Sequence, residues 1–333
     1  MHTTPSRARC WILPAAALAL VASAHAQETP AVGQEQAVPL TFKYTKGQVQ
    51  HLRATLAADM SLSPVGRGDL PDLPLSVKLQ MAFSEKVIGT NKGTGTLAVN
   101  HDSLTVSNNM AGQQTVVRIR GGKVASASLN GSPLSKQQLA QAAARMKDVP
   151  GLKQQVLRRG PDGREVKGPG GQDASAFGPV LMVPNRPVKP GETWEHVELV
   201  KPTIVGLPNS GQVAPPVEVR FTYTLKSVES RGGKQFAIIE TSGSSSNGGQ
   251  AGLNHNYRGT SRFDIGRGVV VAGQYVVDTT VELPAAALGI PPGEGTPERI
   301  RVAGSTQIKM EEAPAAPAAP AAAKPARGRT RKK

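Results

Sequence analysis

The stretch HLRATLAADMSL, residues 51–62, alternates apolar side chains with polar or small ones along its whole length. Leu52 and Leu56 fall on one side of this pattern, whereas Arg53 and Asp59 fall on the other. A two-residue period places successive side chains on opposite faces of an extended strand. The stretch therefore predicts a long β-strand with one buried face and one face toward water, which is typical of antiparallel sheets.

The same alternation recurs through most of the chain. Residues 75–83, LSVKLQMAF, repeat it closely. The other predicted strands are Leu40–Tyr44, Gly95–Val106, Thr115–Ile119, Lys123–Leu129, Thr193–Val200, Val217–Val228, Lys234–Ser244, Tyr257–Ile265, Val269–Leu283 and Ile300–Met310. Thirty-six glycines and 27 prolines supply the turns between them. We therefore predict a mainly β protein, built as a curved antiparallel sheet or half-barrel.

One helix is expected between two groups of strands. Ser132-Pro133 offers one N-terminal signal, and the capping box Ser135-Lys136-Gln137-Gln138 offers another. One helical face would carry Leu139, Ala142, Ala143, Met146 and Val149, and Pro150-Gly151 would end the helix. A hairpin turning at Pro161-Asp162-Gly163 and a glycine-rich linker over 168–177 are predicted to follow.

The composition divides the chain into a signal peptide over 1–26, a disordered lead over 27–37, a β-rich body over 38–312 and a tail over 313–333. Within the body, two candidate halves, 38–130 and 180–312, would be joined by the helix and hairpin over 131–179. Similar strand patterns in the two halves favour an internal duplication. The alternative is that any two runs of antiparallel strands look alike.

The first 26 residues predict export. Two arginines precede the apolar run Cys10–Ala24, and small residues at Ala24 and Ala26 suit a signal peptidase. We expect cleavage between Ala26 and Gln27, and a soluble product in the periplasm or outside the cell. The run is too short for a stable membrane span. Cys10 is the only cysteine, so the exported protein would contain no thiol and no disulfide.

The tail over 313–333 repeats alanine and proline, which cannot build a core, and we expect it to be disordered. Its basic residues are Lys324, Arg327, Arg329, Arg331, Lys332 and Lys333, with no acidic residue after Glu312. They could form a solubilising spacer, or they could contact an anionic envelope polymer or membrane surface. Binding of nucleic acid by the tail is disfavoured by export.

No catalytic or metal-binding constellation stands out. The histidines beyond the signal peptide are widely separated, at His51, His101, His196 and His255. His196 and Glu198 would share one strand face, but no nearby residue supplies a third metal ligand. The serine-rich run over 242–249 lacks the Gly-x-Ser-x-Gly pattern of a nucleophile elbow. The sequence therefore names no catalytic residue and no cofactor, and it argues against an enzyme.

The most specific local signature is Pro184-Asn185-Arg186-Pro187-Val188-Lys189-Pro190-Gly191-Glu192-Thr193-Trp194. Pro190-Gly191 fits the centre of a type II turn, and Trp194 is expected to anchor the core. The pattern Pro184, Pro187, Gly191, Trp194, followed by a strand from Tyr223 to Glu229, resembles an uncharacterised family of exported bacterial β-rich proteins of unknown function. This resemblance runs from about Leu40 to Met310 and implies a shared fold without an activity.

A weaker similarity links the long strands and single helix to periplasmic lipoprotein-carrier-like half-barrels, which curl a sheet around an apolar cavity. It implies a lipid or an apolar small molecule as the ligand. The expected function is thus a non-catalytic envelope protein that binds an apolar ligand or a partner on a curved sheet. The alternative is a structural or interaction scaffold tethered by its basic tail, and an enzyme ranks third.

Overall fold

The computed structural model describes residues 36–66, 71–146, 155–166, 181–200, 217–245, 254–288, 293 and 296–314. The strands up to residue 159 are β1 (Val38–Leu40), β2 (Val49–Pro64), β3 (Leu73–Asn91), β4 (Thr94–Met110), β5 (Gln113–Arg120), β6 (Lys123–Leu129), β7 (Ser132–Pro133) and β8 (Gln155–Arg159). The later strands are β9 (Arg186–Val188), β10 (Thr193–Val200), β11 (Val217–Arg231), β12 (Lys234–Ser245), β13 (Asn254–Asp264), β14 (Val269–Pro284) and β15 (Arg299–Glu312). The helices are α1 (Lys136–Met146) and the short 3-10 helix η2 (Ala285–Leu288).

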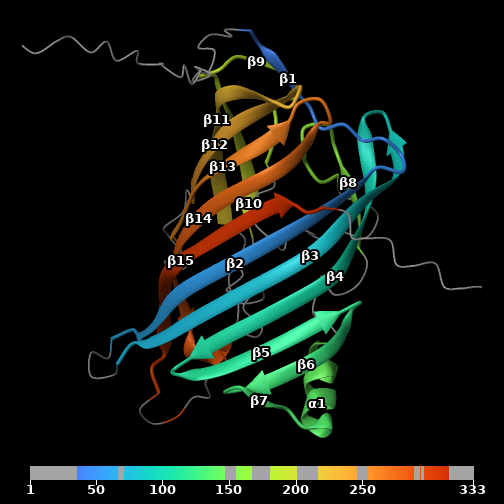
Figure 1. Ribbon diagram of the computed structural model, residues 1–333. Helices are drawn as coiled ribbons and strands as arrows, with labels where there is room; N and C mark the ends of the chain where they lie inside the picture. Colours follow the sequence, from blue (N-terminus) through green and yellow to red (C-terminus); the bar gives the residue numbers. More distant parts are fainter. Residues whose placement is uncertain are drawn as a thin grey trace, which may run out of the picture. The chain divides into compact units, whose positions relative to one another are not determined.

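Thirteen of these described strands form one antiparallel sheet, and β1 pairs separately with β9. The strand order is β10-β11-β12-β13-β14-β15-β2-β3-β4-β5-β6-β7, with β8 beside β4 (Figure 1). The chain is thus mainly β with a single short α-helix among the described residues, which confirms the predicted fold class. The order also shows that β15, the last strand described, joins the two groups of strands.

The register confirms the two-residue period that the sequence shows. One row of directly paired residues crosses eleven strands on the same face, through Trp194, Tyr223, Thr241, Gly259, Tyr275, Ile308, Leu56, Leu79, Val106, Val117 and Ala127. We call this face the inner face. The neighbouring row, which includes Thr222, Arg258 and Gln307, points to the outer face, where polar side chains predominate.

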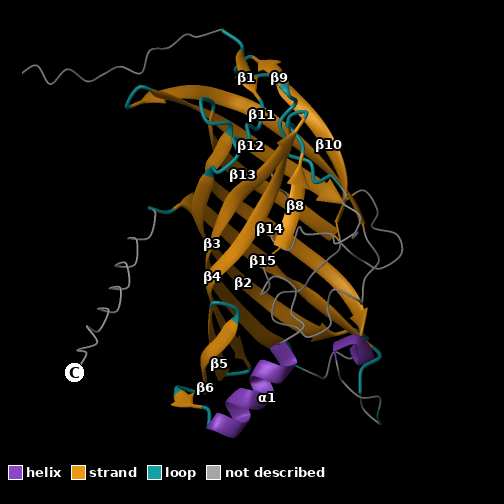
Figure 2. Ribbon diagram, turned by 90° about the vertical axis from the view of Figure 1, so that its right-hand side faces the viewer, coloured by secondary structure: helices purple, strands orange, loops and turns teal. Residues whose placement is uncertain are grey.

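The sheet is curved around its inner face (Figure 2). Val77 from β3 belongs to the same buried cluster as Phe221 from β11 and Ile239 from β12, although these strands are far apart in the sheet order. Phe221 and Ile239 are fully buried. The cluster runs along the inner face through the intervening strands, with Leu56 of β2, Val302 of β15 and Val277 of β14 among its members.

The two groups of strands follow the same order, β2 to β6 in one group and β10 to β14 in the other. In each group, consecutive strands are hairpin neighbours. The order is compatible with duplication and with two independent meanders, so duplication stays a prediction.

The predicted strand Leu40–Tyr44 is wrong beyond Leu40. The backbone N–H of Phe42 donates to Pro161 O at 2.8 Å, and that of Lys43 donates to Gly268 O at 3.1 Å. These bonds go to two separate turns, so the segment crosses the end of the sheet without joining its ladder. The apolar side chains of this segment nevertheless enter the core, as Phe42 does with 5% exposed.

The capping box begins α1, as the second N-terminal signal predicted. Ser135 N donates to Gln138 Oε1 at 3.0 Å, and Gln138 N donates to Ser135 Oγ at 3.3 Å. Pro133 lies in β7 and not in the first helical turn, which corrects the other signal. The helix contacts β6 at one end of the sheet (Figures 1 and 2), and its predicted end at Pro150-Gly151 lies outside the described residues.

Candidate functional site

Residues 189–194 of the signature form a turn followed by an aromatic anchor, and together they are called the clasp. Gly191 has φ +84° and Glu192 N donates to Lys189 O at 3.0 Å, which is the predicted type II geometry. Trp194 stacks on Tyr223 with ring centroids 5.7 Å apart and donates from Nε1 to Met182 O at 2.9 Å. These contacts hold the preceding segment, including Leu181 with 2% exposed, against the inner face.

The two signature prolines lie just before the clasp. Pro187 lies in β9 opposite Pro39 of β1, and Pro184 immediately follows the buried segment. Neither residue contributes a group that could do chemistry. The signature therefore has a structural role, because it positions the chain. The other predicted site residues lie at the cleavage site Ala26–Gln27 and in the basic tail, and they fall outside the described residues.

The histidines do not form a centre. His51 lies on β2, His196 on the inner side of β10 and His255 on β13, while His101 lies on β4. Burial and then the charge of Arg164 lower the pKa of His196. Within the described residues, no group of three or more histidine, cysteine, aspartate or glutamate side chains is arranged to hold a metal ion.

The inner face keeps a cavity of about 180 Å³ beside the packed core. Its lining comes from β2, β3, β4, β8, β14 and β15 and from the segment before β2. The apolar side chains in it include Leu52, Ala54, Leu56, Leu79, Met81, Phe83, Val87, Leu97, Val99, Leu157, Ile308 and Met310. Four aromatic side chains, Phe42, Tyr44, Phe83 and Tyr275, also line the cavity.

One end of the cavity carries a buried ion pair. Arg159 Nη1 and Nη2 donate to the two carboxylate oxygens of Glu85, at 3.2 and 3.3 Å. The two side chains are only 10% and 15% exposed. Burial alone would lower the pKa of Arg159, but the charge and hydrogen bonds of Glu85 keep it above its usual value.

Tyr44 lies close enough to this ion pair for both of its charges to act on the phenol. Its hydroxyl donates to Gly160 O at 2.9 Å, and burial raises the pKa of the phenol. The ring lies directly on Gly95 of β4, where a Cβ atom would come within 2.4 Å of the ring. Glycine at this position is therefore needed for the ring to approach the sheet.

His101 completes the lining on the side of β4. Its ring lies 6.0 Å from the ring of Phe83, centroid to centroid. Burial lowers its pKa, and the neighbouring Asp102 opposes this only in part. The imidazole is therefore neutral near pH 7 and compatible with the apolar lining.

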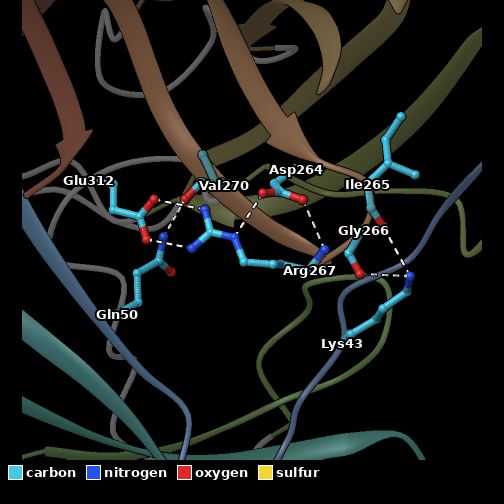
Figure 3. A network of polar contacts seen from close by, with 8 residues as sticks. All are labelled: Lys43, Gln50, Asp264, Ile265, Gly266, Arg267, Val270 and Glu312. Atoms are coloured by element: carbon cyan, nitrogen blue, oxygen red, sulfur yellow. Dashed lines mark hydrogen bonds and ion pairs between the residues drawn. The ribbon is translucent and has the colours of Figure 1, made fainter. Parts of the chain in front are cut away.

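A polar network fixes the segments that border the cavity (Figure 3). Arg267 donates to Asp264 at 2.8 Å and forms two bonds of 2.7 Å to Glu312 at the end of β15. Lys43 Nζ donates to the carbonyls of residues 265 and 266, at 3.0 and 3.1 Å. Gln50 Nε2 donates to Val270 O at 2.6 Å. Together these bonds tie the turn between β13 and β14 to the segment before β2 and to the end of β15, and they join β2 to the start of β14.

A second hollow, of about 830 Å³, lies mainly on the outer face of β11 to β15 and β2. Hydroxyl, amide and charged side chains line most of it, among them Thr222, Glu240, Arg258 and Gln307. The solvated face of an antiparallel sheet carries side chains of this kind wherever it occurs. We assign no ligand to it.

The sequence itself carries a signal for the ion pair. Glu85 occupies the next alternate position after Phe83 on the apolar face of β3, and Arg159 has the same relation to Leu157 on β8. A charged residue on the buried side of an alternating pattern points to a partner across the sheet. The sequence alone could not show that these two residues are partners, because β4 lies between their strands.

Comparisons with known proteins add little to this geometry. No protein-family model and no curated protein matches the chain. One solved structure that matches is DynF from the dynemicin biosynthesis pathway of Micromonospora chersina, which is 5% identical, with 85% of this chain and 86% of DynF covered. Its TM-score of 0.21 is too low to carry an argument about fold or function.

Among the described residues, no helix combines the length and apolar character needed to cross a membrane.

Proposed function

We propose that this protein is exported and binds an apolar ligand without catalysis, in the cavity on the inner face of its curved sheet. The cavity itself is the observation that carries the proposal. Protein interiors are normally close-packed, and a partly open, mainly apolar cavity of this kind is a suitable site for a small apolar molecule. Here it is lined by six strands that the fold holds in fixed register, so the site is formed before the ligand arrives.

The first experiment asks whether the protein carries such a ligand. The protein, exported with its own signal and purified without detergent, is measured by native mass spectrometry and then extracted with organic solvent. We expect an apolar molecule in near-stoichiometric amount. A protein mass without ligand, together with no binding of the apolar fluorophore phenylnaphthylamine, would refute the proposal and favour the scaffold alternative.

A matched pair of variants locates the site. Ala54 lies on the inner face of β2, opposite Met81 and Met310, and lines the cavity. Ala57 lies on the outer face of the same strand. Ala54→Leu should weaken phenylnaphthylamine binding by about fivefold to a hundredfold, since the larger side chain would occupy part of the cavity and steric crowding of this kind costs roughly 1–3 kcal/mol. Ala57→Leu should leave binding unchanged, and equal effects of the two substitutions would place the ligand elsewhere.

A further inference from the structure

Basic side chains gather on the outer face of β3 to β6 and β8, which are neighbours in the sheet (Figure 1). Within the described residues, none of these side chains has an ion pair or a hydrogen bond. We call this surface the basic face. The register places six basic residues on it, namely Lys78, Lys86, Arg118, Arg120, Lys123 and Arg158.

Basic side chains on the outer face of β13 and β15 have acidic partners instead. The ion pairs there join Arg258 to Asp278, Arg301 to Glu282 and Lys309 to Glu311, with N–O distances of 3.1, 2.7 and 3.2 Å. The two parts of the outer face therefore differ in charge. The basic face presents cations that no carboxylate of the described chain neutralises.

The sequence accounts for this difference. Asp102 is the one acidic residue of β4, β5 and β6, and none follows it until Asp148. Arg120 and Lys123 also lie directly opposite each other on β5 and β6, and like charges in that position destabilise an antiparallel pair. An anionic partner would relieve this repulsion. The stretch between the two aspartates holds six basic residues, Arg118, Arg120, Lys123, Lys136, Arg145 and Lys147.

Exposed apolar side chains on the same face indicate which anionic partner fits. Directly paired residues form one row across β2, β3, β4 and β8, through Val49, Lys86, Ala98 and Val156. The two valines at the ends of this row are 46% and 62% exposed. A soluble polyanion offers charge alone, whereas a bilayer surface offers anionic head groups to the cations and an apolar boundary to the valines. The combination favours a membrane surface.

We propose that the basic face docks this protein on a bilayer that contains anionic lipids. This surface is separate from the basic tail, which lies outside the described residues. The inference goes beyond the proposed function, because docking requires neither a cavity nor a ligand. Where both hold, β3 and β4 line the ligand cavity with their inner face, while their outer face rests on the membrane in which apolar molecules dissolve.

The first test measures co-sedimentation of the full exported chain with vesicles of phosphatidylcholine, alone or mixed in equal parts with phosphatidylglycerol. We expect binding to the mixed vesicles only, and weaker binding as salt shortens the range of the electrostatic attraction. The triple variant Arg118→Gln, Arg120→Gln, Lys123→Gln should bind about tenfold to a hundredfold more weakly. Each basic residue near an anionic surface contributes roughly a factor of five to binding.

The matched control is the triple variant Arg258→Gln, Arg301→Gln, Lys309→Gln, which removes the same three charges from ion-paired positions. It should bind nearly as tightly as the wild type. Equal losses in the two triple variants would mean that binding follows net charge alone, and would overturn the inference. So would equally tight binding of the wild type to soluble heparin that the first triple variant loses, which would identify a soluble polyanion as the partner.

A fluorescent label separates the basic face from the tail and does not depend on the folding of the triple variants. Ser126 pairs with Arg118 on the outer face of β6, and Ser242 lies on the outer face of β12. Ser126→Cys and Ser242→Cys are each labelled with a dansyl group in the exported protein, from which Cys10 is expected to be absent. Mixed vesicles should shift the dansyl emission to shorter wavelength for Ser126→Cys and not for Ser242→Cys.

The remaining outcomes tell this inference apart from the proposed function. Vesicle binding without an emission shift in Ser126→Cys would leave the tail as the docking segment and overturn the inference. Vesicle binding with the shift, in a protein that takes up no phenylnaphthylamine, would refute the proposed function and support docking by the basic face.

Discussion

His255 makes the stability of this protein depend on pH in a way that can be worked out from its surroundings. The side chain is 6% exposed on β13, and its Nδ1 atom lies 2.8 Å from Thr279 Oγ1. Its Nε2 atom is buried without a hydrogen-bond partner among the described residues. Burial lowers the pKa of the imidazole from 6.5 to about 4. The folded protein therefore holds this histidine neutral at a pH where the unfolded chain would protonate it.

The direction and size of the effect follow from this difference in pKa. As the pH falls below 6.5, the unfolded chain binds a proton that the folded protein accepts only near pH 4, so the free energy of unfolding decreases. At roughly 1.4 kcal/mol for each unit of pKa, the loss reaches about 3 kcal/mol below pH 4. Above pH 7 both states hold a neutral histidine, and this contribution vanishes.

The assay is urea unfolding of the wild type and of His255→Gln, followed by circular dichroism from pH 8 to pH 4. Glutamine keeps a polar group near Thr279 but does not titrate. The difference in unfolding free energy between the two proteins cancels the other titrating groups, so it should be constant above pH 7. Below that, the wild type should lose about 3 kcal/mol relative to the variant. Parallel curves down to pH 4 would refute the reasoning.

Two further substitutions test the polar end of the cavity by stability alone. Arg159→Met should cost roughly 3–5 kcal/mol of unfolding free energy because it leaves the Glu85 carboxylate buried and unpaired, and adding Glu85→Met should recover most of that loss; a double variant no more stable than the single one would contradict this. Gly95→Ala should cost roughly 1–3 kcal/mol through the clash with Tyr44, measured by thermal or urea unfolding. The same substitution should cost much less in a Tyr44→Leu background, and an equal cost in both backgrounds would show that the ring is not responsible.

The local features of the fold could be predicted from the sequence because they depend on neighbouring residues. Alternation over residues 51–62 predicted a strand with one buried face, and β2 has it. The capping box at Ser135 and the turn at Gly191 were also predictable, since each closes a hydrogen bond within three residues. Leu40–Tyr44 was predicted incorrectly, because its apolar spacing reflects packing across the end of the sheet and not pairing in it.

The cavity and its ion pair could not be predicted from the sequence, because both depend on which strands lie side by side. Glu85 and Arg159 were visible as charges on apolar faces, but their pairing depends on the order β3-β4-β8. β8 can lie beside β4 because β5 pairs with only part of the same edge of β4 and leaves the rest of that edge to β8. Alternation within a strand carries no information on which strand lies beside it.

The place of β15 between β14 and β2 has a consequence for how the chain reaches its native state. The last strand described pairs Met310 with Ala54, and among the described strands it alone links the early strands to the late ones within the sheet. Until it is synthesised, β2 and β14 each present a long unpaired edge, and such edges are prone to aggregate. Contacts between such distant parts of a chain also form slowly. Folding of the complete sheet is therefore a late event, and a chain truncated before Arg299 would be left with two exposed edges.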